Sequence, residues 1–105
     1  MPGLYKVLDR DRFFARSYLG TKSPMVLVDI STTGCAFRTS QDMPKGSYIA
    51  IEFDKLSEEH LFKPSIQATC EAVYSLDIVG STKRIGTKFV EIDRTDVEKI
   101  REFTE

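Results

Sequence analysis

Two short patterns in the sequence place chemically capable side chains at fixed spacings. The first is R-x-x-x-R, with Arg12 and Arg16, and the second is D-x-S-x-x-G, with Asp29, Ser31 and Gly34. A guanidinium is planar and permanently charged, so it can bind a phosphate through two parallel hydrogen bonds. A carboxylate only accepts hydrogen bonds, and residues two apart in an extended strand point to the same face. The patterns indicate a binding site for an anionic ligand.

The distribution of charge along the chain supports this interpretation. Residues 1–24 hold five basic and two acidic side chains, whereas residues 25–105 hold ten basic and fourteen acidic ones. The net charge of the whole chain is −1. A near-neutral total argues against binding of DNA or RNA, which needs a basic surface. The positive surplus near the N-terminus favours a small anionic ligand there.

The elements that must position these residues are mostly strands. Five stretches of β-branched or alternating sequence are expected to be strands, at residues 25–30, 34–39, 47–53, 65–74 and 83–92. Polar residues 54–60 are expected to form a loop. Five or six short strands separated by turn residues predict a small antiparallel β-barrel.

The C-terminal end changes from strand periodicity to helix periodicity. Val97, Ile100 and Phe103 form an apolar stripe at helical spacing, and Asp93 is suited to cap the N-terminus of a helix over residues 94–104. The stripe is expected to pack on the barrel. Its use as a dimer face is an alternative, so we expect a monomer or a weak homodimer.

The cysteines and the histidine do not form a recognisable catalytic or metal site. Cys35 and Cys70 lie in apolar contexts, and we expect both to be buried and unpaired. A structural zinc site needs four ligands, which two cysteines and His60 do not supply. Cys35 and His60 are an alternative nucleophile and base, although His60 is expected in an exposed loop. We expect no metal, no catalytic residues and no enzymatic activity.

The 105-residue chain fits one domain, and no apolar run approaches the roughly 18 residues of a membrane span. The first residues lack the apolar core of a secretory signal. We therefore expect a cytoplasmic protein that does not associate with membranes.

With both motifs in this order around the start of a β-barrel, the sequence resembles the PilZ domain family. The resemblance covers nearly the whole chain and includes the Gly46 turn, the glycine and aromatic of Gly86–Phe89 and the closing helix. It implies a six-stranded antiparallel barrel with a short C-terminal helix over residues 17–105. Only twelve residues separate Arg16 from Asp29, which is short for the first strand and turn of this family, so residues 17–20 are expected to form only a stub of that strand. A flexible N-terminal arm over residues 1–16 would carry R-x-x-x-R.

PilZ domains are receptors for cyclic di-GMP, a bacterial second messenger with two phosphates and two guanines. By resemblance, Arg12 and Arg16 hold phosphate and guanine, and Asp29 accepts hydrogen bonds from the guanine N1–H and N2–H₂ groups. Ser31 contacts the ligand beside Asp29, and Gly34 allows a positive φ or a close approach of the backbone to the ligand. The resemblance implies an adaptor without a cofactor, whose arm becomes ordered on binding and signals to an effector protein.

An alternative to the receptor function stays open. The chain can be a PilZ-like scaffold that makes only protein contacts, in which case the arginines are solvated surface residues and Asp29, Ser31 and Gly34 serve turn chemistry. Tyr74, at the end of the longest strand, offers a ring for stacking on a guanine.

Overall fold

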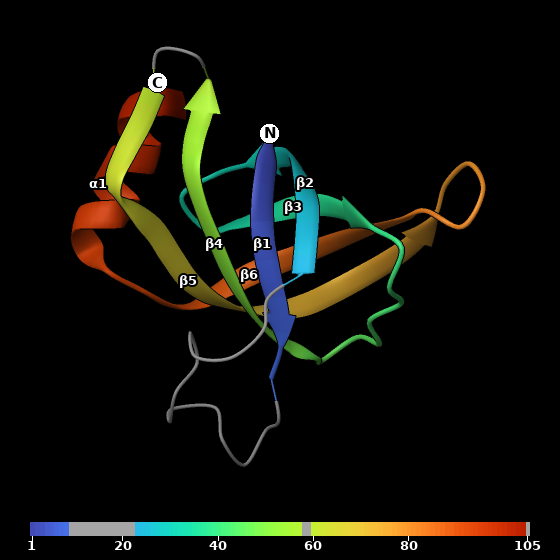
Figure 1. The fold of residues 1–105 in the computed structure, drawn as a ribbon. Coiled ribbons are helices and arrows are strands. Elements are labelled where there is room, and N and C mark those ends of the chain that lie inside the picture. Colours follow the sequence, from blue (N-terminus) through green and yellow to red (C-terminus); the bar gives the residue numbers. More distant parts are fainter. Residues whose placement is uncertain (9–22, 58–59, 105) are drawn as a thin grey trace.

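The computed structural model describes residues 1–8, 23–57 and 60–104. Six antiparallel strands form a closed barrel in the order β1-β2-β3-β6-β5-β4, and a helix follows (Figure 1). The elements are β1 (Pro2–Val7), β2 (Ser23–Ile30), β3 (Gly34–Thr39), β4 (Tyr48–Ser57), β5 (His60–Asp77), β6 (Lys83–Ile92) and α1 (Arg94–Thr104). The prediction of a mainly β barrel with a short C-terminal helix is confirmed. Among the residues described, no helix is both long and apolar enough to cross a membrane.

The N-terminus differs from the expected arm. Residues 2–7 form β1, which lies between β2 and β4 and pairs with both (Figure 1). Tyr5 is the reason this short segment belongs to the barrel: its ring is buried and stacks on Phe37 with ring centroids 5.8 Å apart. The rest of the expected arm, and the strand stub at residues 17–20, lie outside the described residues.

The region between the third and fourth expected strands also differs. Residues 54–60 were expected to be a loop, yet β4 continues to Ser57 and β5 begins at His60. Lys55 pairs with Leu61 and Ser57 with His60, so the hairpin extends beyond its apolar part. The polar sequence here has a low intrinsic strand propensity, and it is extended because its residues pair with the neighbouring strand.

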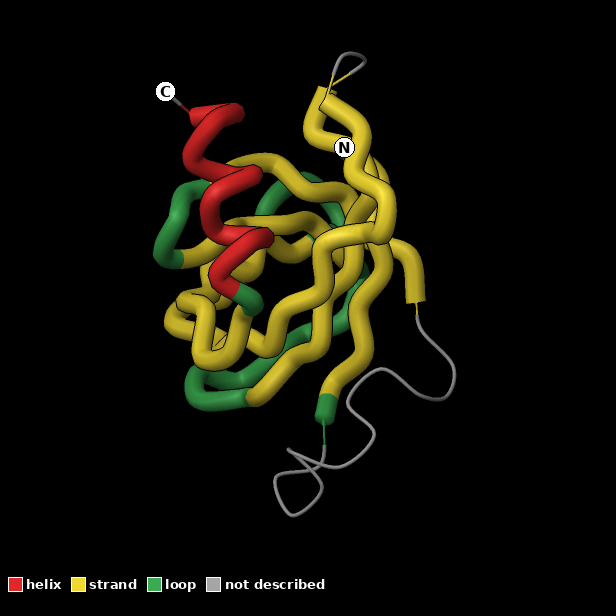
Figure 2. Tube along the Cα trace, turned by 90° about the vertical axis from the view of Figure 1, so that its left-hand side faces the viewer, coloured by secondary structure: helices red, strands yellow, loops and turns green. Residues whose placement is uncertain are grey.

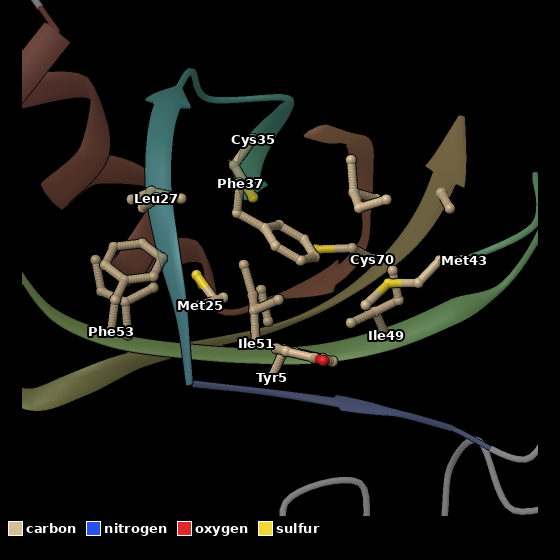
Figure 3. Packing of buried hydrophobic residues seen from close by; sticks show 14 of the residues in the cluster. Tyr5, Met25, Leu27, Cys35, Phe37, Met43, Ile49, Ile51, Phe53 and Cys70 are labelled. Atoms are coloured by element: carbon tan, nitrogen blue, oxygen red, sulfur yellow. The ribbon is translucent and has the colours of Figure 1, made fainter. Parts of the chain in front are cut away.

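The barrel interior holds the core. The alternating apolar residues of β4 and β5 point inward as expected, with Ile49, Ile51, Ile66 and Cys70 at most 1% exposed (Figure 3). Cys35 and Cys70 are both buried and free, which confirms the prediction for them. Burial raises the pKa of Cys70 well above its usual range.

Helix α1 lies against the strands beside one opening of the barrel (Figure 2). Ile100 is fully buried in the core cluster, and Phe103 packs against it. The backbone N–H of Thr95 donates to Asp93 Oδ1 at 3.0 Å, which is the expected helix cap. The apolar stripe therefore docks the helix on the barrel.

Candidate functional site

The pairing of four strands brings the second motif next to residues from the C-terminal half of the chain. Asp29 on β2 pairs with Ala36 on β3, Ala36 pairs with Gly86 on β6, and Gly86 pairs with Tyr74 on β5. Directly paired residues project to the same face of a sheet. These four residues therefore form a row across the outer surface of the barrel, which we call the Asp29 row.

A pocket of about 260 Å³ lies along this row. All four residues of the Asp29 row line it, together with Ser31, Gly34 and Lys88. Ala36 carries only a methyl group and is 5% exposed, and Gly86 lies beneath the ring of Tyr74. Asp29 and the Tyr74 ring therefore border the pocket above these two small residues.

The carboxylate of Asp29 is available to a ligand. Asp29 is exposed, and no described residue makes a hydrogen bond or an ion pair with it. It follows a register shift between Leu27 and Asp29, and shifts of this kind re-aim side chains at strand ends. The site thus contains a hydrogen-bond acceptor without a protein partner in the described part of the chain.

Ser31 orders the turn that connects β2 to β3. Its hydroxyl lies 3.0 Å from Thr33 Oγ1 and accepts a hydrogen bond from the Thr33 backbone N–H at 3.2 Å. The Ser31 backbone N–H donates to the Gly34 carbonyl at 2.9 Å. The turn chemistry considered for Ser31 is therefore present, and the same turn places Ser31 at the pocket.

Gly34 is required by the packing of two strands. A Cβ atom at this position would lie 2.1 Å from the carbonyl oxygen of Thr87 on β6. The φ of Gly34 is not in the left-handed region, which is occupied by Gly46 and Gly80 instead. The expectation of a positive φ at Gly34 is therefore wrong. The close approach at Gly34 is one of β3 to β6, and it places the end of the motif beside the middle of β6.

Tyr74 is fixed over Gly86. A Cβ atom on Gly86 would lie 1.8 Å from a ring carbon of Tyr74, so the ring covers this glycine. Arg84 Nε donates to the Tyr74 hydroxyl at 3.2 Å. This hydrogen bond, with a smaller contribution from the charge of Asp29, raises the pKa of Arg84. Tyr74 remains 36% exposed, so part of the ring stays open to solvent.

The sequence motifs identify only part of this site. Asp29, Ser31 and Gly34 come together at the pocket, whereas Arg12 and Arg16 lie outside the described residues. Sequence reasoning missed Lys88, and it gave Gly86 no role in a pocket. The available signal was the alternation of positions 84, 86 and 88, which places them on one face of β6.

The described residues include no group of three or more histidine, cysteine or acidic side chains arranged to hold a metal ion. The structure gives no support to Cys35 and His60 as a catalytic nucleophile and base. The thiol of Cys35 lies inside the barrel, 3.4 Å from Thr87 Oγ1, and His60 is the first residue of β5.

Comparisons with known proteins agree with this architecture. The PilZ domain model matches residues 10–105. Among solved structures, the Bacillus subtilis inhibitor of motility, MotI/DgrA, is similar with a TM-score of 0.69 and 12% identity, over 98% of this chain and 45% of that one. No curated protein sequence matches significantly. Because the family model covers nearly all of a closed barrel that carries the D-x-S-x-x-G turn at its pocket, this chain belongs to the PilZ domain family.

Proposed function

We propose that this protein is a cyclic di-GMP receptor that acts as an adaptor for another protein. PilZ domains form a family of cyclic di-GMP receptors, which gives the ligand class. The observation that carries the proposal for this chain is the Asp29 row. It places a carboxylate without a described protein partner and the aromatic ring that covers Gly86 along one pocket on the outer surface.

The chemistry of guanine fits this row. Guanine offers N1–H and N2–H₂ donors on one edge, and a carboxylate such as Asp29 accepts from both. A purine can also stack on an aromatic ring, for which the open part of Tyr74 is positioned. Arg12 and Arg16 would supply bidentate contacts to a phosphate or to the O6/N7 edge of guanine.

Signalling in this proposal depends on the connection between β1 and β2. Arg12 and Arg16 lie in that connection, so binding would draw residues 9–16 onto the ligand and change the surface offered to a partner. The effector protein is not identified. The neighbour MotI/DgrA is named an inhibitor of motility, and this chain spans less than half of it. The protein would act in the bacterial cytoplasm, where the second messenger is made, without enzymatic activity or a cofactor.

Calorimetric titration tests the receptor function. We expect saturable binding of cyclic di-GMP and none of GTP or cyclic di-AMP. Asp29→Asn should weaken binding by about tenfold or more, because a charged acceptor is lost. Asp54→Asn is a matched control. Asp54 is an exposed acid on β4, and β4 is not paired with β2 or β3, the strands that carry the D-x-S-x-x-G motif. Absence of saturable binding to the wild type up to about 50 µM would favour the nucleotide-independent scaffold instead.

Hydrogen exchange tests the ordering step separately. Amides of residues 9–17 should exchange more slowly with cyclic di-GMP than without it, while amides of β1 should be equally protected in both states. Equal exchange over residues 9–17 in the two states would refute ordering and leave the receptor function intact.

A further inference from the structure

A second row of side chains runs beside the Asp29 row on the outer surface of the barrel. Val26 pairs with Arg38, Arg38 pairs with Arg84, and Arg84 pairs with Leu76. Two arginines therefore stand directly opposite each other on β3 and β6. Like charges in directly opposed positions destabilise a sheet, so a bare pair is unfavourable.

No acidic side chain among the described residues pairs with either arginine. Arg38 is exposed, and none of the described residues gives it a hydrogen bond or an ion pair. Arg84 donates to the hydroxyl of Tyr74. Of the acids nearby, Asp77 is bound by Lys83 and Asp42 accepts from the hydroxyl of Ser75. Asp29 is close enough for its charge to raise the pKa of Arg84, but it makes no ion pair with either arginine. The pair thus presents positive charge that an anion from outside can neutralise.

The geometry places this charge where a ligand at Asp29 would need it. The pocket of about 260 Å³ lies below the ~300–1,000 Å³ of typical ligand sites, so a two-nucleotide ligand must extend beyond it. Successive residues on one face of a strand are roughly 6.7 Å apart, which is within reach of an arginine side chain. At the other end of the pocket, Lys88 lies 3.8 Å from Glu71, so that charge is already partly neutralised.

We propose that Arg38 and Arg84 form a clamp for a phosphate of the cyclic di-GMP whose guanine is held at Asp29. The clamp rests on the proposed receptor function and adds to it a barrel-borne phosphate contact that is independent of Arg12 and Arg16. Arg84 approaches from the side of Tyr74, which holds its guanidinium, and Arg38 approaches from β3. Two planar guanidinium groups on either side of one phosphate provide paired, charge-assisted hydrogen bonds.

Titration of Arg38→Gln with cyclic di-GMP tests the clamp most directly, because Arg84, and not Arg38, donates the hydrogen bond to Tyr74. We expect affinity to fall by about tenfold or more, with a melting temperature that is unchanged or higher because one of two opposed like charges is removed. The difference in affinity between the wild type and Arg38→Gln should become smaller at high salt, since exposed charges are then screened. Arg94→Gln is the matched control: Arg94 is exposed at the first turn of α1 and belongs to neither row. Arg84→Gln should weaken binding as well.

The outcomes separate the clamp from the receptor function. Wild-type binding that Arg38→Gln leaves unchanged would overturn the clamp alone. An equal loss in Arg38→Gln and Arg94→Gln would also overturn it, because the effect would then reflect net charge. No binding by the wild type would overturn the receptor function, and the clamp with it.

Discussion

Two glycines on the outer face of the barrel shape the site, each because a different atom occupies the space of its missing side chain. At Gly34 the space is filled by the backbone of β6, and at Gly86 it is filled by the ring of Tyr74. A backbone carbonyl cannot move without disturbing the strand pairing, whereas a ring can rotate away. The same substitution should therefore have different consequences at the two positions.

Gly34→Ala should lower the free energy of unfolding by about 3 kcal/mol, because the new methyl group meets the Thr87 carbonyl at 2.1 Å. Gly80→Ala is the control. Gly80 has a φ of +73° with open space around it, so the cost there is only the left-handed conformation, about 1–2 kcal/mol. Urea unfolding measures both. A Gly34→Ala variant no less stable than Gly80→Ala would contradict the steric account.

Gly86→Ala should be destabilising only while Tyr74 is present. The added Cβ displaces the ring, at a cost of about 1–3 kcal/mol for overpacking. In a Tyr74→Ala background the space is free, and alanine in a strand is no worse than glycine. A double-mutant cycle in urea measures this coupling. Additive effects of the two substitutions would show that the ring does not lie over Gly86 in solution.

At the scale of elements, the spacing of apolar residues correctly predicted the strands and the helix that have a regular apolar face. The strands at Gly34–Thr39 and Lys83–Ile92 and the helix at Arg94–Thr104 begin and end where the sequence predicted. Strand β1 was missed because it holds a single buried side chain, Tyr5, whose partner Phe37 is distant in sequence. The polar ends of β4 and β5 were missed because pairing, not propensity, makes them strands.

The candidate site also has a part that the sequence could predict and a part that it could not. Asp29, Ser31 and Gly34 form a local motif, so their proximity follows from one turn and could be predicted. The contributions of Tyr74 and Arg84 depend on the register of β3, β6 and β5, which includes a shift between Ala72 and Tyr74. A shift of one residue exchanges the inner and outer faces of a strand, and no single-strand pattern reveals it.

The cap of α1 makes the stability of the helix depend on pH. The backbone N–H of Thr95, and then its hydroxyl, donate to the carboxylate of Asp93 and lower its pKa below the ordinary value of 3.8. The cap therefore stabilises the fold fully above pH 3.8, and this contribution is lost as pH falls through the lower folded-state pKa. Asp93→Asn keeps a capping side chain that does not titrate in this range.

Melting temperatures of the wild type and of Asp93→Asn, measured from pH 7 down to about pH 2, test this dependence. The difference between the two proteins should be constant at neutral pH. Below pH 3.8 the wild type should lose stability relative to the variant. Parallel curves over the whole range would show that the carboxylate does not cap the helix.

For the molecule as a whole, the position of β1 changes how the R-x-x-x-R segment is held. Strand β1 ends at Val7 and β2 begins at Ser23, so Arg12 and Arg16 lie between two paired strands of the closed barrel. A segment attached at both ends has fewer conformations to lose on binding than an arm attached at one end.

Deletion of residues 1–7 distinguishes a barrel strand from a dispensable arm. The deletion removes Tyr5 from the core and leaves β2 and β4 without their shared neighbour, so cooperative thermal unfolding should be lost. The double variant Arg12→Ala, Arg16→Ala should instead keep the wild-type melting temperature and lose affinity for cyclic di-GMP. Circular dichroism melts and calorimetry on both proteins measure these outcomes. A truncated protein that melts like the wild type would show that the barrel is stable without β1.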